Sequence, residues 1–362
     1  MNTNTHILGS NQIDMAKLLS AVAAARTPEA NEEADLKARL RKVGIVTTPY
    51  DELSKVIQEV ANASAELLAH NISPVVGERR EVGHLVSLAG ASGSGKTFSL
   101  ERLLGRNDVL NPRVDGRSVP TWRMVTLRSP LDRKSIGEQI LRQIGMPLDP
   151  RHGMNEPQIY DAIYLHLKAN GIALLVFDEI QHVVRELSPR KRKIVADTIK
   201  SFTNCDEWRT SVVASGLPKG LKLYHDHANS LQNARRHHLV TLPALEPSIH
   251  GPAFELALAR YAEIADISLG HCQGPEFVAR LFKGSLNTMG LAVRMTHEAI
   301  LLTSRRDDDR TLRLGDYADV YRSITGARSA ENPFKASSWE RMRLPTIKDM
   351  MTKVRLALGE DD

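Results

Sequence analysis

The chain has 362 residues, of which 42% are apolar, 25% charged and 5% aromatic. This composition is typical of a globular protein and excludes a collagen-like fibre or a wholly disordered chain. The formal net charge of +5 permits an acidic partner such as nucleic acid, without requiring one.

Neither the cysteine count nor the hydropathy pattern indicates an extracellular or membrane protein. Cys205 and Cys272 are too few for a disulfide framework or a zinc cluster, so we expect small buried side chains. The longest apolar run near the middle, residues 172–177, is too short to cross a bilayer. The first residues lack the basic stretch and apolar core of a secretory signal. We therefore expect a cytoplasmic protein that makes no membrane contact.

The first part of the chain is predicted to be helical. Residues 1–50 are mixed and polar, and we interpret them as an N-terminal arm with short helices near residues 15–25 and 32–42. Over residues 51–70, apolar residues recur at three- and four-residue steps, which predicts an amphipathic helix with Asp51 as its N-cap.

Apolar runs then alternate with helical patterns. The strands are predicted at residues 84–89, 122–127, 172–177, 210–214 and 239–242, and the helices at residues 97–104, 132–144, 158–169 and 189–202. This alternation predicts an α/β fold with a parallel sheet and helices on both faces. The run at 172–177 is almost continuously apolar, as expected of a strand that is buried on both faces.

After Pro243 the pattern becomes helical, with apolar faces over residues 254–265, 277–282 and 292–302. We place a boundary near residue 245. The predicted organisation is an arm (1–50), an α/β nucleotide-binding core with its leading helix (51–245), a small all-α lid (246–328) and a basic C-terminal tail (329–362).

A phosphate-binding loop follows the first strand. The pattern G-x-x-x-x-G-K-[ST] is complete, in the order Gly90, Ala91, Ser92, Gly93, Ser94, Gly95, Lys96 and Thr97. Glycines let the backbone curl around an anion, and the N-terminus of the following helix adds its dipole. Lys96 would reach the β- and γ-phosphates of ATP, and the Thr97 hydroxyl would coordinate Mg²⁺. The alternative is a Gly/Ser-rich surface turn.

An acidic pair ends the buried strand at residues 172–177. Asp178 lies where a parallel strand presents its carboxyl end, which suits a ligand of Mg²⁺. Glu179 follows directly and can act as a general base on the attacking water. The alternative is a helix-capping acidic pair without catalytic function.

These motifs resemble those of the AAA+ ATPases, and more narrowly the TniB/TnsC type of transposition regulator. The resemblance covers roughly residues 50–335. It is carried by VFDEIQH at residues 176–182, by a strand-and-helix unit at residues 125–147 (VTLRSPLDRKSIGEQILRQIGMP), by the helical lid and by ENPF at residues 331–334. It implies a P-loop NTPase (AAA+) fold, slow and assembly-dependent ATP hydrolysis, and a homo-oligomeric ring or filament.

The resemblance also implies three further site residues. Ser215 matches the sensor-1 strand near the γ-phosphate, although a small residue at a strand end is an equal alternative. Arg236, or next Arg235, matches an arginine finger for the neighbouring subunit; the alternative is a solvated or DNA-facing basic pair. Arg294 matches the sensor-2 helix on the nucleotide, with an ordinary surface arginine as the alternative.

Basic segments favour contact with duplex DNA through its backbone, at low sequence specificity. They comprise Arg185, residues 190–193, Arg341, Arg343, Lys348, Lys353 and Arg355. The alternative for residues 190–193 is the solvent-exposed start of a helix. The C-terminal tail can bind either DNA or a transposase.

The first functional hypothesis is an ATP-dependent regulator of DNA transposition. It would oligomerise on target DNA, recruit or activate a transposase with help from a target-selection protein, and disassemble on hydrolysis. A helicase loader or replication-initiation ATPase is the first alternative, although the stretch after Arg328 is too short for a winged-helix domain. A nucleotide-switch scaffold is the second.

Overall fold

The computed structural model describes residues 15–74, 81–128, 132–146, 153–181, 188–221, 237–306 and 309–344. They divide into two compact units. The α/β unit contains the described parts of Val46–Gly251 and Leu281–Val293. The helical unit contains the described parts of Met1–Ile45, Pro252–Arg280 and Arg294–Asp362.

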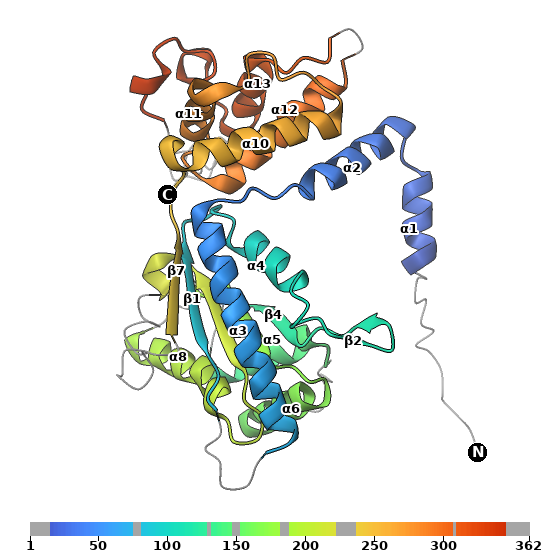
Figure 1. Cartoon of the computed structure of the whole chain (residues 1–362), viewed down its shortest axis with the longest axis vertical. Coiled ribbons are helices and arrows are strands. Elements are labelled where there is room, and N and C mark those ends of the chain that lie inside the picture. The colour runs from blue at the N-terminus through green and yellow to red at the C-terminus, as the bar shows by residue number, and fades with distance from the viewer. Residues whose placement is uncertain are drawn as a thin grey trace, which may run out of the picture. The chain divides into compact units, whose positions relative to one another are not determined.

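A five-stranded sheet forms the centre of the α/β unit (Figure 1). Its strands are β1 (Leu85–Gly90), β4 (Trp122–Thr126), β5 (Leu174–Asp178), β6 (Ser211–Gly216) and β7 (His237–Leu242). The order across the sheet is β4-β5-β6-β1-β7, and each neighbouring pair is parallel. The predicted parallel sheet is therefore confirmed, and the fold is that of an AAA+ P-loop ATPase, followed by a helical C-terminal region.

Helices surround and follow this sheet. Those of the α/β unit are α3 (Thr48–Ile72), α4 (Lys96–Gly105), α5 (Arg133–Ile144), α6 (Glu156–Ala169) and α8 (Pro189–Asn204). The helices α10 (Pro247–Ala265), α11 (Gly274–Gly284) and α12 (Met289–Ser304) each include residues of both units. The helical unit adds α1 (Met15–Ala24), α2 (Pro28–Arg41) and α13 (Leu314–Thr325), with short 3-10 turns at Ser329–Glu331 and Trp339–Arg341.

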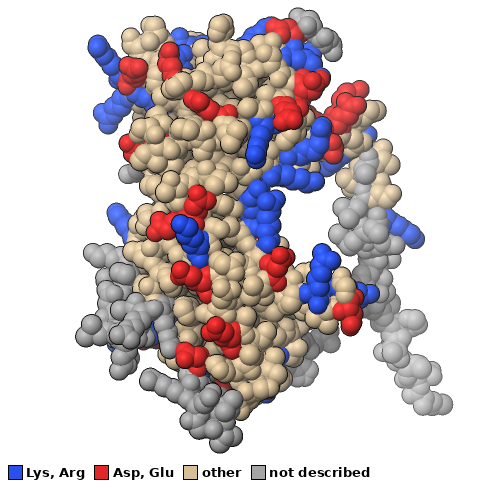
Figure 2. Space-filling view, in the orientation of Figure 1, with Lys and Arg blue, Asp and Glu red and all other residues tan. Residues whose placement is uncertain are grey.

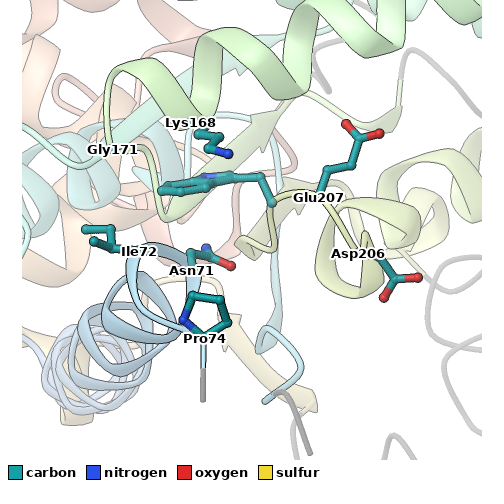
Figure 3. A pocket seen from close by; sticks show the side chains of 8 residues that line it. Asn71, Ile72, Pro74, Lys168, Gly171, Asp206 and Glu207 are labelled. Carbon is teal, nitrogen blue, oxygen red and sulfur yellow. The ribbon is translucent and has the colours of Figure 1, made fainter. Parts of the chain in front are cut away.

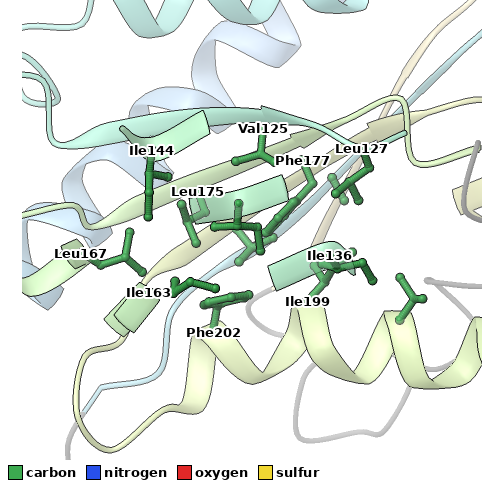
Figure 4. Packing of buried hydrophobic residues seen from close by; sticks show 14 of the residues in the cluster. Val125, Leu127, Ile136, Ile144, Ile163, Leu167, Leu175, Phe177, Ile199 and Phe202 are labelled. Atoms are coloured by element: carbon green, nitrogen blue, oxygen red, sulfur yellow. The ribbon is translucent and has the colours of Figure 1, made fainter. Parts of the chain in front are cut away.

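The two faces of the sheet bury alternate residues of the same strands. Leu174 and Val176 of β5 pack in a core with α3 and α4 residues. Leu175 and Phe177 point to the other face, where they pack with residues of α5, α6 and α8 (Figure 4). A strand with apolar side chains on both faces must be covered on both, which explains the unbroken apolar run in the sequence.

The structure corrects two details of the sequence prediction. Asp51 is not an N-cap, because α3 begins earlier, at Thr48, after the N-cap residue Thr47. A proline lies in the first turn of α3, where its missing N–H costs no hydrogen bond. A small hairpin of β2 (Arg113–Val114) and β3 (Arg117–Ser118) was not predicted, and it projects from the α/β unit (Figure 1).

The helical unit joins segments from both ends of the chain. The two predicted N-terminal helices are confirmed as α1 and α2. On α2, Leu40 is fully buried, and Glu33 forms an ion pair of 2.5 Å with Arg305, the residue that follows α12. Near the other end, Phe334 stacks on Tyr317 of α13 with ring centroids 5.5 Å apart. Among the helices that the structure describes, none is long and apolar enough to span a bilayer.

Candidate nucleotide site

The loop between β1 and α4 has the backbone conformation of a phosphate cradle. Gly93 and Gly95 adopt φ values of 76° and 90°, which side-chain-bearing residues rarely adopt. The Ser94 N–H donates to Ala91 O at 3.1 Å, so the loop is closed by its own backbone. It leads into the N-terminus of α4 at Lys96, where successive N–H groups and the helix dipole favour an anion.

Lys96 is buried beneath this loop. Its Nζ donates to Gly90 O and Ala91 O, both at 2.9 Å. Burial lowers the pKa of Lys96, while the negative charges of Glu179 and Asp178 act in the opposite direction. The ammonium group is therefore held between the loop and two carboxylates, at the place where phosphate charge would be neutralised.

Thr97 and Asp178 meet although they come from different elements. The Thr97 hydroxyl donates to Asp178 Oδ2 at 2.5 Å, and Asp178 is 2% exposed. A hydroxyl oxygen and a carboxylate are the hard ligands that Mg²⁺ prefers, with water and phosphate oxygens completing its shell. This pair fits the magnesium site predicted from the sequence, and the metal-binding role stays a prediction.

Glu179 takes an unusual backbone conformation directly after β5. Its φ is 60°, which is uncommon outside glycine, and its N–H is held by Asp178 Oδ1 at 2.9 Å. Strained residues of this kind cluster at functional sites. The turn brings the Ile180 N–H to Ser215 O at 3.0 Å, so the segment after β5 is tied to β6.

Two serine hydroxyls of the site are buried and lack a hydrogen-bond partner among the described residues. They belong to Ser94 in the loop and to Ser215 on β6, the strand between β1 and β5. Buried hydroxyls are normally hydrogen-bonded, and exceptions are places where a ligand or water belongs. The position of Ser215 fits the predicted sensor-1 role, which stays a prediction.

The start of α12 contacts the phosphate loop within the α/β unit. The Gly290 N–H donates to Gly93 O at 2.6 Å. Leu286 and Asn287, just before it, both have φ of 54°, and Asn287 O accepts a bond of 2.7 Å from the Leu245 N–H. No sequence pattern predicts this contact, because its partners lie far apart in the chain.

Of the three predicted arginines, Arg294 alone belongs to the described residues. Arg235 and Arg236 lie outside the described residues, as do Arg185, Lys348, Lys353 and Arg355. Arg294 lies on α12 in the helical unit and is exposed. The arginine finger and sensor 2 therefore stay predictions.

A separate pocket of about 410 Å³ lies near the amino ends of β5 and β6, whereas the phosphate loop follows the carboxyl end of β1 (Figure 3). Lys168, Asp206 and Glu207 are among its lining residues, and Asp206 points away from Lys168. Trp208 also lines it and donates its indole N–H to Ile172 O at 2.6 Å. This mixture of charges has none of the anion-binding geometry of the phosphate loop.

Comparison with known proteins agrees with this geometry. Residues 79–222 match the family model described as AAA domain. No curated protein sequence is detectably similar to the chain.

Several solved structures are distantly similar to this chain. Cdc6p from Pyrobaculum aerophilum is 13% identical, with a TM-score of 0.48, over 88% of this chain and 82% of that one. The ORC2 protein of Aeropyrum pernix, in ADPNP–ADP complexes, is 15% identical, with a TM-score of 0.47, over 75% and 68%. The ORC1 protein of Aeropyrum pernix, in complex with DNA, is 17% identical, with a TM-score of 0.45, over 75% and 66%. At these scores and identities, no function follows from the likeness.

Proposed function

We propose that the chain is an ATP-hydrolysing AAA+ switch that assembles on duplex DNA and regulates transposition. The observation that carries the ATPase part is the gathering of Lys96, Thr97, Asp178 and Glu179 around one phosphate loop. The transposition part is supported by the sequence features around these motifs. Basic and acidic side chains of the described residues are interspersed on the face seen in Figure 2.

In the proposed reaction, Glu179 accepts a proton from water while the water oxygen bonds to the γ-phosphorus. The bond from that phosphorus to the β–γ bridging oxygen breaks, and ADP keeps the electron pair. Lys96 balances the phosphate charge. Thr97 and Asp178 would hold Mg²⁺, which when bound neutralises charge on the phosphate oxygens.

Steady-state turnover tests the hydrolysis step. Glu179→Gln should lower kcat by about 10²–10⁴-fold while ATP still binds, because a general base is lost and the fold is kept. Glu101→Gln is the matched control, since it removes the same charge from an exposed position on α4. Equal turnover in both variants would refute the role of Glu179.

Assembly on DNA is tested by electron microscopy of the protein with duplex DNA, with and without a slowly hydrolysed ATP analogue. Rings or filaments that need nucleotide and persist in Glu179→Gln support the proposal. Affinity for DNA should fall steeply with salt, because backbone contacts release counterions. Nucleotide-bound monomers that ignore DNA would refute the assembly mechanism.

The arginine finger is tested by mixing variants. A subunit with Arg236→Ala keeps its own site but offers no finger, and a Glu179→Gln subunit does the reverse. If the finger acts in trans, the mixture recovers turnover that neither variant has alone. Arg235→Ala in the same assay identifies which arginine acts.

The alternative function is a helicase loader or replication-initiation ATPase, which needs the same nucleotide switch on DNA. Each role predicts a different ATP-dependent partner: a DDE transposase for the first, a replicative helicase for the second. Co-sedimentation of the DNA-bound protein with each purified partner from the source organism separates them.

A further inference from the structure

The side chain of Gln181 connects the proposed general base to the end of β6. Its Nε2 donates to the carboxylate of Glu179, and its Oε1 accepts the Leu217 N–H at 3.0 Å. A backbone N–H can only donate, so the amide oxygen must face Leu217. The amide nitrogen then faces Glu179, which accepts this bond best as a carboxylate.

Gln181 is also enclosed by backbone on its other side. The residue is 9% exposed. A Cβ on Gly216 would lie 2.8 Å from Gln181 Oε1, and a Cβ on Gly220 would lie 3.0 Å from Gln181 Cα. Both positions therefore need glycine for Gln181 to keep this place. The side chain has little freedom, and so it can hold Glu179 in one orientation.

We propose that Gln181 is a positioning residue for ATP hydrolysis, which orients the Glu179 carboxylate by bridging it to the backbone that follows Ser215. The inference rests on the proposed hydrolysis by Glu179. Ser215 is the penultimate residue of β6, which pairs with β1, the strand before the phosphate loop. The Ile180 N–H donates to Ser215 O at 3.0 Å. If nucleotide binding displaces β6, the Gln181 side-chain amide would transmit that displacement to the Glu179 carboxylate.

Two substitutions separate positioning from simple packing. Gln181→Ala removes both hydrogen bonds. Gln181→Glu keeps an acceptor for the Leu217 N–H but replaces the donor to Glu179 with a second carboxylate. Gln158→Glu adds the same charge at an exposed capping position of α6 and is the matched control.

The measurements are kcat with and without duplex DNA, the Kd of a fluorescent ATP analogue, the Tm, and the pH dependence of kcat. We expect both Gln181 variants to lose about 10–100-fold in kcat, as for other residues that orient a catalytic group, with Kd changed less than about threefold. In Gln181→Glu, a second carboxylate lies beside Glu179, so the pH dependence of kcat should differ from that of wild type, which loss of packing alone would not cause.

Each outcome decides between the two proposals. An unchanged kcat and pH profile in active Gln181 variants overturns the positioning role alone, as does a loss of kcat matched by loss of both ATP affinity and Tm. A wild type whose turnover is absent, or is unaffected by Glu179→Gln, overturns the proposed hydrolysis and the positioning role together.

Discussion

The Gly290 N–H donates a hydrogen bond of 2.6 Å to the carbonyl oxygen of Gly93, and this contact joins the start of α12 to the phosphate loop. A Cβ on Gly290 would lie only 2.8 Å from Gly93 O. The close approach therefore requires glycine, and any side chain there must displace backbone of the nucleotide site.

We expect Gly290→Ala to weaken ATP binding by about tenfold, because overpacking costs about 1–3 kcal/mol and the loop must shift to relieve it. Titration with a fluorescent nucleotide measures the effect. Gly105→Ala is the control, since a Cβ at this helical position meets nothing within 4 Å. Equal affinity in the two variants would contradict the constraint.

In Thr97→Val, the factor by which Mg²⁺ strengthens ATP affinity should fall by about 10–100-fold. Valine keeps the shape of threonine but removes the hydroxyl that donates to Asp178. Thr97→Ser keeps the hydroxyl and should retain most of the affinity. Nucleotide titrations over a range of Mg²⁺ concentrations distinguish the two, and a Thr97→Ser variant as defective as Thr97→Val would argue against the metal role.

Ser215→Ala should separate function from stability. The hydroxyl is buried without a partner among the described residues, so its removal should change the free energy of unfolding by less than about 0.5 kcal/mol. If Ser215 contacts the γ-phosphate, kcat falls about tenfold or more. Ser64→Ala on α3 removes another buried hydroxyl that has no hydrogen-bond partner in the described part of the chain, and it should leave both quantities unchanged. Urea unfolding and steady-state turnover test this.

His297 should make the helical unit sensitive to acid. Burial, and then the charge of Arg41, lower its pKa from 6.5 to about 4, and its ring packs edge-on to Tyr261 at 4.9 Å. The unfolded chain therefore binds a proton more readily than the folded one. The stability that depends on neutral His297 is fully present above pH 6.5, falls as the pH drops from 6.5 to 4, and is lost below pH 4.

The loss amounts to at most about 3 kcal/mol. His297→Phe keeps a ring against Tyr261 and cannot be protonated, so its Tm should fall less than that of wild type between pH 7 and 4.5. Thermal unfolding at a series of pH values measures this. Parallel decreases in the two proteins would exclude His297 as the cause.

Most of the sheet and the centre of the site could be predicted from sequence, because their signals are local. The phosphate loop occupies eight consecutive residues, and Asp178 and Glu179 directly follow a strand whose apolar run identifies it. The β2–β3 hairpin escaped prediction because two-residue strands are too short to show an alternating pattern.

The contacts that refine the site could not be predicted in this way. Gln181 meets Leu217, and Gly290 meets Gly93, only because β-strand order and chain reversals bring distant segments together. The positive φ of Glu179 is equally invisible in sequence, since glutamate shows no local preference for it.

The chain passes between its two units at four points, after Ile45, Gly251, Arg280 and Val293. A minimal fragment that ended at residue 245 would contain the phosphate loop and the whole sheet. It would nevertheless lack Leu281–Val293, and with it the N–H that bonds to Gly93 and the carbonyl that receives the Leu245 N–H. The α/β unit is therefore discontinuous along the chain. Fragment expression or exchange with a homologue must carry residues 46–293 as one block, because no single cut separates an intact α/β unit.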